Sequence, residues 1–187
     1  YERGLSGTPL GTLALAADQV FGGTVMISGA RLDLGATSQS FDKVVLQSGS
    51  LSGGSFAARL EAWSGTIGSV LSGSGALVKE GSGQVELVSA MQNSGGVFVN
   101  GGSLVLGVNN ALPLSQPITV TGGALVLLGG GVQSVSNLML GGGSILGGTL
   151  DSGTASAGSL AAAVFNFSSG RVTSVLSGSG KLLLSGG

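Results

Sequence analysis

One phrase decides the fold of this chain, and it reads Val97-Phe98-Val99, Asn100-Gly101-Gly102-Ser103, Leu104-Val105-Leu106. Three apolar residues lead into a glycine turn, and three more apolar residues follow it. The phrase occurs earlier as residues 25–34 and returns in shorter form further along the chain. Its turn glycines recur at steps of 20, 16, 16, 20, 21 and 20 residues, at Gly29, Gly49, Gly65, Gly81, Gly101, Gly122 and Gly142.

A fixed period of this size, built from strand-length pieces, indicates a solenoid whose repeats contact mainly their neighbours. Apolar and polar residues alternate in places, as in Val85-Glu86-Leu87, which is typical of strands. Glycine costs a helix about 1 kcal/mol per site relative to alanine, whereas a left-handed glycine turns a corner without steric cost. Two-residue hairpins at Asn100-Gly101 are the rival interpretation, but hairpins give no reason for such a period. The sequence therefore predicts an all-β parallel coil with rungs of about 16–21 residues.

The sequence also contains a longer repeat, which spans several rungs. Residues 64–75 match residues 169–180 at an offset of 105, while upstream matches, such as Gln39 with Gln133, have offsets of 93 or 94. The offset grows because residues are inserted near 151–158, where Ser, Thr, Ala and Gly predict a loop. We expect a single solenoid over residues 1–187, made of two degenerate super-repeats at about 1–83 and 95–187.

Composition excludes several classes of function. The 187 residues include 38 Gly and only 15 charged residues, with a net charge of −1, so no basic stripe is present to bind nucleic acid. The hydrophobic share of 42% argues against disorder. Although mean hydropathy is +0.54, the longest apolar run is six residues, 160–165, against about 20 for a spanning helix, so we expect no membrane insertion. The chain has no Cys and no His, which removes thiolate and imidazole metal ligands and any Ser–His or Cys–His nucleophile.

The stretch from Leu71 to Leu87, LSGSGALVKEGSGQVEL, closely resembles the autotransporter-associated β-strand repeat, also called the passenger-associated transport repeat. The resemblance is strongest over residues 64–147 and continues through Asn110-Ala111-Leu112. It implies a right-handed parallel β-helix in a surface-exposed or secreted bacterial protein, commonly an adhesin-like stalk. The chain departs from the pattern where members often carry Tyr before Gly-Gly, and the second copy has Leu184 in place of Lys79.

Some parallel β-helices cleave polysaccharides with clustered carboxylates, often with Ca²⁺. The eight acidic residues here are scattered, and corresponding repeat positions do not reinforce them. Glu80 and Glu86 flank one turn and could share a cation, but we interpret both as solvated surface residues. The Gly-Ser-Gly triplets at 73–75 and 81–83 lack the following helix that a phosphate loop needs, so they are interpreted as turns. The sequence therefore predicts no catalytic, cofactor or metal site and no enzymatic activity.

Aromatic residues could form a glycan-binding row, but a place in the coil interior is the favoured interpretation. It is proposed for Phe56, Phe98, Phe165 and Phe167, and least firmly for Trp63, whose repeat counterpart is Ser168. The period places Leu125 and Val99 inside the coil and Glu86 outside.

The leading hypothesis is structural: a rigid segment of an extracellular bacterial stalk, adhesin or filament. The alternative is a glycan-binding or glycan-cleaving β-helix. A parallel coil ends in rungs with unpaired backbone groups, and the apolar Leu182-Leu183-Leu184 offers no polar cap. We therefore expect an internal piece of a longer polypeptide, with further copies of the same solenoid joined end to end, covalently or by stacking. Surface glycans or proteins of a host or neighbouring cell are further partner candidates.

Overall fold

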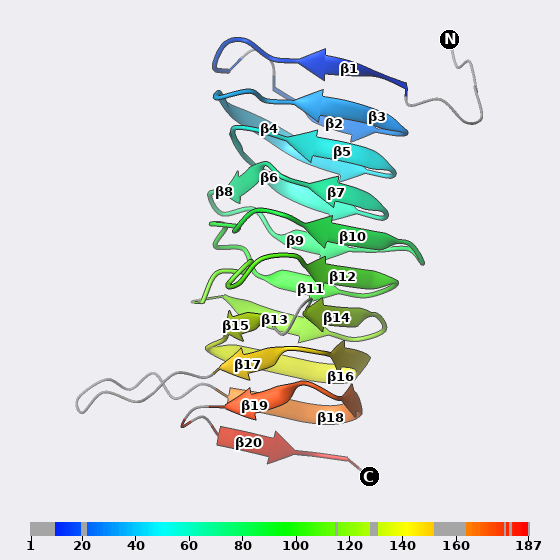
Figure 1. Ribbon diagram of the computed structural model, residues 1–187, viewed down its shortest axis with the longest axis vertical. Helices are drawn as coiled ribbons and strands as arrows, with labels where there is room; N and C mark the ends of the chain where they lie inside the picture. Colours follow the sequence, from blue (N-terminus) through cyan, green and yellow to red (C-terminus); the bar gives the residue numbers. More distant parts are fainter. Residues whose placement is uncertain are drawn as a thin grey trace.

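The protein is described by a computed structural model over residues 10–19, 22–114, 116–127, 131–151, 164–177, 179 and 181–186. This part of the chain is all-β and contains strands without any helix. Figure 1 shows them stacked in one elongated coil, with β1 at one end and β20 at the other. The strands are β1 (Leu10–Ala14), β2 (Thr24–Ile27), β3 (Ala30–Asp33), β4 (Ser38–Leu46), β5 (Gly49–Ser52), β6 (Ser55–Ala62), β7 (Gly65–Ile67), β8 (Val70–Ser72), β9 (Leu77–Lys79), β10 (Gln84–Leu87), β11 (Val97–Val99), β12 (Ser103–Leu106), β13 (Pro117–Val120), β14 (Ala124–Leu127), β15 (Val132–Ser134), β16 (Asn137–Leu146), β17 (Thr149–Asp151), β18 (Val164–Val172), β19 (Val175–Ser177) and β20 (Lys181–Leu184).

Two faces of the coil carry continuous parallel ladders. Face A consists of β2, the second halves of β4 and β6, β9, β11, β13, the first halves of β16 and β18, and β20. Face B consists of β1, β3, β5, β7, β10, β12, β14 and the second halves of β16 and β18. Every strand in these ladders pairs with the strand one turn away, so the predicted parallel β-solenoid is confirmed.

The third side, face C, is regular only toward the two ends of the coil. Toward one end, the first half of β4 pairs with the first half of β6, which in turn pairs with β8. Toward the other end, β15, β17 and β19 form a separate three-stranded sheet. Between them, residues 88–96 and 107–114 form no strand, yet the Met91 amide donates to the Ala111 carbonyl at 2.8 Å. Buried Gln39 and Gln133 occupy matching places, and each donates from Nε2 to a carbonyl of the preceding rung, at Ala17 or Leu112.

The rung length follows the predicted period. On face B, Leu13 pairs with Leu32, Leu32 with Leu51, and Leu51 with Ile67, which are steps of 19, 19 and 16 residues. Later steps run from 19 to 21 residues, until Ile145 pairs with Val172 at a step of 27. The loop predicted near 151–158 falls within that long step, and its residues 152–158 lie outside the described residues.

The core is built from stacked columns of like residues. One column on face A stacks seven fully or nearly fully buried side chains: Val44, Leu60, Leu77, Val97, Ile118, Leu138 and Phe165. Leu125 and Val99 are also fully buried, as the period predicts. Stacking on like neighbours buries each apolar side chain between two others, and this burial is the main force that favours the coil.

Glycine corners join face A to face B. Gly49 and Gly65 have φ of +100° and +120°, which confirms the predicted role of glycine there. At the corner between β11 and β12 the left-handed residue is Gly102 (φ +59°) rather than the predicted Gly101. The turns themselves change along the coil: residues 47–48 and 63–64 form two-residue turns, whereas residues 80–83 form a four-residue turn.

Candidate functional site

Charged side chains on the outside of face A form one small network. Glu61 lies between Lys43 and Arg59, with Lys43 Nζ 2.8 Å from Oε2 and Arg59 Nε 3.2 Å from Oε1. The hydrogen bond from Lys43, with the charges of both cations, outweighs partial burial and lowers the pKa of Glu61. A carboxylate held ionised by two cations is poorly suited to general acid catalysis. Because Lys43 lies on β4 and Glu61 on β6, the network links neighbouring rungs.

A second network surrounds Asp33 on face B. Its Oδ2 accepts from Arg31 Nη2 at 3.0 Å, and its Oδ1 accepts from the Gly35 amide at 2.9 Å. The Gly35 hydrogen bond is the largest cause of the lowered pKa of Asp33, and Arg31 adds to it. Arg31 also donates from Nε to Ser52 Oγ on the next rung at 2.9 Å.

The carboxylates of the described residues do not converge. Glu80 Oε1 accepts from Asn100 Nδ2 at 2.7 Å, and Asn100 Oδ1 accepts from Thr121 Oγ1 at 3.0 Å, so these three side chains form a polar ladder over three rungs. No group of three potential metal ligands occurs in the part of the chain that the structure describes. In the same part, no helix is long and apolar enough to cross a bilayer.

Lys79 is fully buried inside the coil, at the corner where the turn widens. Its register partners are Ala62 above and Val99 below, so it replaces an apolar residue in a core column. The ammonium Nζ donates to the carbonyl oxygens of Glu80, of Gly81 at 3.3 Å and of Gly101 at 3.1 Å. A single cation therefore satisfies three inward-pointing carbonyls of two successive turns, which stabilises the corner.

We expect Lys79→Met to lower the free energy of unfolding by about 1–3 kcal/mol, because the three carbonyls would stay buried without their donor. Relief of the buried charge opposes this loss but does not supply a hydrogen bond. Urea unfolding followed by circular dichroism measures the change. Lys181→Met, at an exposed position, is the matched control and should change stability little.

The pH dependence of that difference provides a second readout. Burial lowers the pKa of Lys79 below its ordinary value of 10.5, with a smaller opposing effect from Glu80. Between the lowered pKa and 10.5 the unfolded chain holds more protons than the folded one, so the stability of the parent rises with pH in that window. The stability difference between the parent and Lys79→Met should therefore grow as pH approaches 10.5. A difference that shrinks would contradict the burial of this ammonium.

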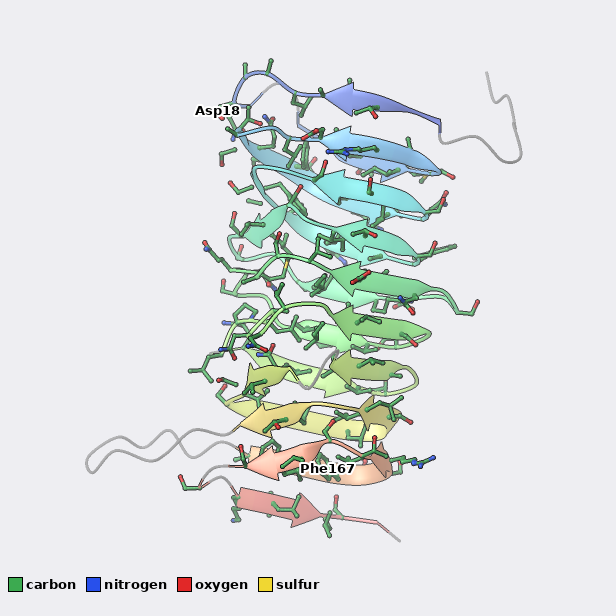
Figure 2. All side chains as sticks on the ribbon, in the orientation of Figure 1. Asp18 and Phe167 are labelled. Carbon is green, nitrogen blue, oxygen red and sulfur yellow. The ribbon has the colours of Figure 1, made fainter. Side chains whose placement is uncertain are left out.

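The aromatic residues divide between the core and the surface. Phe56 and Phe165 are buried, as predicted, and Phe41 packs on Phe56 with ring centroids 6.4 Å apart. Phe167, on β18 near the C-terminal end of the coil (Figure 2), is partly buried against the core. The interior placement of Phe98 is wrong: it lies between buried Val97 and Val99, so strand alternation turns it outward, and it is half-buried there.

Trp63 lies on the surface rather than in the core. Its side chain is 45% exposed and lines a hollow of about 410 Å³ together with Gln47, Ser64 and residues 81–83. The hollow sits at the corner between faces A and B, directly outside the turn that Lys79 holds from within.

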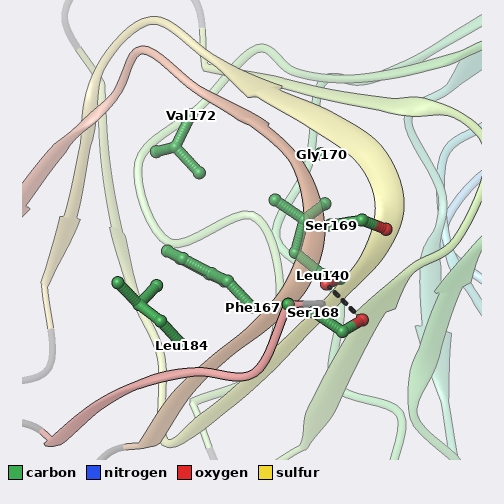
Figure 3. A pocket seen from close by; sticks show the side chains of 8 residues that line it. Leu140, Phe167, Ser168, Ser169, Gly170, Val172 and Leu184 are labelled. Carbon is green, nitrogen blue, oxygen red and sulfur yellow. Dashed lines mark hydrogen bonds between the residues drawn. The ribbon is translucent and has the colours of Figure 1, made fainter.

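A second hollow, of about 370 Å³, opens at the C-terminal end of the coil. Figure 3 shows Leu140, Phe167, Val172 and Leu184 around it, with Ser168 Oγ donating to the Leu140 carbonyl at 3.3 Å. These four residues belong to inward-facing columns of the last rungs, so the hollow is the open end of the core.

Comparison with known proteins adds no further assignment. No protein-family model, no curated protein sequence and no solved structure matches the chain.

Proposed function

We propose that the chain is a rigid, non-catalytic segment of a bacterial cell-surface or secreted protein, such as a stalk, an adhesin or a filament. The observation that carries the proposal is the pair of unbroken parallel ladders on faces A and B over the length of the coil. Such a stack gains length by repetition, because each rung satisfies its backbone hydrogen bonds through its neighbours. The resemblance of residues 71–87 to the passenger repeat of autotransporters supports the surface location.

The end rungs support joining to further rungs of the same kind. Leu13 stacks on the core residue Leu32 but is 55% exposed, because it lies in the first rung of the ladder. At the other end, Leu184 stacks on Phe167 and is 74% exposed beside the open hollow of Figure 3. An apolar strand with an unpaired edge is a template for another strand. The occupant we propose for each end is a further solenoid rung, from the same polypeptide or from a second copy.

Leu184→Lys is expected to reduce association of the isolated chain strongly, because it places a charge where the next rung would pack. Static light scattering over a concentration series measures this. Leu183→Lys is the matched control, since Leu183 pairs with outward-facing Asn166 and should leave association largely intact. If both variants associate as the parent does, the end rungs are not the contact. The surface location is tested separately by antibodies against the chain, which should label intact cells.

A further inference from the structure

The four-residue turn 80–83, called the ledge below, projects beyond the turns that precede it. Turns 47–48 and 63–64 have two residues each, so the ledge extends past them, as Figure 1 shows between β9 and β10. The hollow of about 410 Å³ lies where the ledge extends past the shorter turn 63–64. Its lining consists of Gln47, Trp63, Ser64 and the ledge residues Gly81, Ser82 and Gly83. A change in turn length therefore creates a concave place at this corner of the coil.

Trp63 presents its indole to this hollow. Tryptophan is highly buried on average, yet nearly half of this side chain is accessible. The residue beneath it is Gly81, where an added Cβ would lie 3.6 Å from Cβ and Cγ of Trp63, and where φ is +65°. A side chain at position 81 would be strained and would lie against the indole, so glycine keeps this side of the hollow clear.

The rest of the lining is polar and uncharged. Gln47 supplies a side-chain amide, and Ser64 and Ser82 supply hydroxyls. Ser64 Oγ donates to the main-chain carbonyl of Gln47 at 2.7 Å. No charged side chain lines the hollow among the described residues. An aromatic face with a few hydrogen-bonding groups around it is the composition of a small-ligand site.

We propose that Trp63 and the ledge bind one ring of a neutral saccharide. The indole face carries negative electrostatic potential and accepts the weakly positive axial C–H groups of a pyranose. The hydroxyls of the sugar are both donors and acceptors, which matches the amide of Gln47 and the hydroxyl of Ser82. The absence of a cation in the lining favours a neutral sugar over an acidic one.

Lys79 holds the ledge from inside the coil. It binds the carbonyls of Glu80 and Gly81, which are the first two residues of the ledge. A ledge fixed in this way is already shaped before the sugar arrives, which reduces the entropy lost on binding. The saccharide site goes beyond a purely structural rod, because it gives one corner of the rod a recognition role.

Intrinsic fluorescence tests the proposal directly, because Trp63 is the only tryptophan of the chain. The parent is titrated with methyl glycosides of glucose, galactose, mannose and N-acetylglucosamine, with sorbitol as a non-ring polyol and glucuronate as an acidic sugar. We expect a saturable change with at least one neutral glycoside, half-complete in the millimolar range, and no change with sorbitol. A response to none of the neutral glycosides, or an equal response to sorbitol, overturns the proposal, and binding of glucuronate alone overturns the choice of a neutral sugar.

Two variants locate the binding. Ser82→Leu leaves the fluorophore in place and should weaken binding at least tenfold, whereas Ser74→Leu, in the same Gly-Ser-Gly context on another corner, should bind as the parent does. Both serines are exposed, so neither change should disturb the fold. Trp63→Ala is followed by saturation-transfer NMR of the sugar and should lose the signal. Unchanged binding by Ser82→Leu or Trp63→Ala overturns the site.

Discussion

Leu125→Asp is expected to lower the free energy of unfolding by about 4 kcal/mol, enough to unfold much of a marginally stable chain. Leu125 is fully buried and stacks between Leu104 and Ile145 on face B. A carboxylate at this place would have no water and no charged partner in either neighbouring rung. Thermal unfolding followed by circular dichroism would report the change as a large drop in the midpoint.

The matched control is Glu86→Gln, which should shift stability by no more than about 0.5 kcal/mol. Glu86 lies between Thr66 and Val105 in an outward-facing column of the same face, so the change removes a charge without altering the core. If Leu125→Asp melted no earlier than the parent, the register of face B would be wrong.

Gly65→Ala is expected to destabilise the coil by about 3 kcal/mol. Gly65 has φ of +120°, a backbone conformation that residues with a side chain rarely adopt. A Cβ at this position would also overlap the carbonyl oxygen of Gly49 in the preceding corner. Because the obstacle is backbone on an adjacent rung, relief requires the two corners to move apart and weakens their ladder.

Gly141→Ala provides the comparison for that prediction. Gly141 also lies at a corner between face A and face B, but its φ is not in the left-handed range. The nearest atoms to an added Cβ there are at 3.8 Å, which is ordinary contact. This variant should keep the stability of the parent or exceed it slightly, since alanine restricts the unfolded chain. Equal losses in the two variants would show that corner geometry is not the cause.

The parallel ladder could be predicted from the sequence because the same pattern of apolar strands and glycine turns recurs along the chain. At Gly49 and Gly65 the glycine spacing of 16 residues equals the step between the paired residues Leu51 and Ile67, and at the other corners it lies within four residues of the strand step. Strand alternation then decides which side chains face inward, and it does so correctly for Val99 and Leu125. The same rule explains two further placements. Phe98 follows inward-facing Val97 and turns outward, against its predicted interior place, and Lys79, whose place was not predicted from the sequence, stacks on inward-facing Val99. Position in the strand decided in both cases.

The hollow at Trp63 could not be predicted in this way. It exists because a four-residue turn at 80–83 follows two-residue turns, and the size of the step depends on how successive rungs are registered. Sequence repeats predict the average length of a rung, but not how far one particular corner projects beyond the corner before it. The hydrogen bonds of Lys79 depend on the relative position of two corners as well, since Nζ donates to carbonyl oxygens of two neighbouring turns.

We propose above that the chain is a rod whose end rungs stack on further rungs of the same kind. Small-angle X-ray scattering over a concentration series tests this proposal most directly. Nine stacked strands at about 4.8 Å correspond to a rod of about 40 Å. We expect the longest dimension to grow with concentration in steps of about that length, while the cross-sectional radius of gyration stays constant. A longest dimension that stays at the single-rod value at every concentration, or a cross-section that grows in its place, would contradict it.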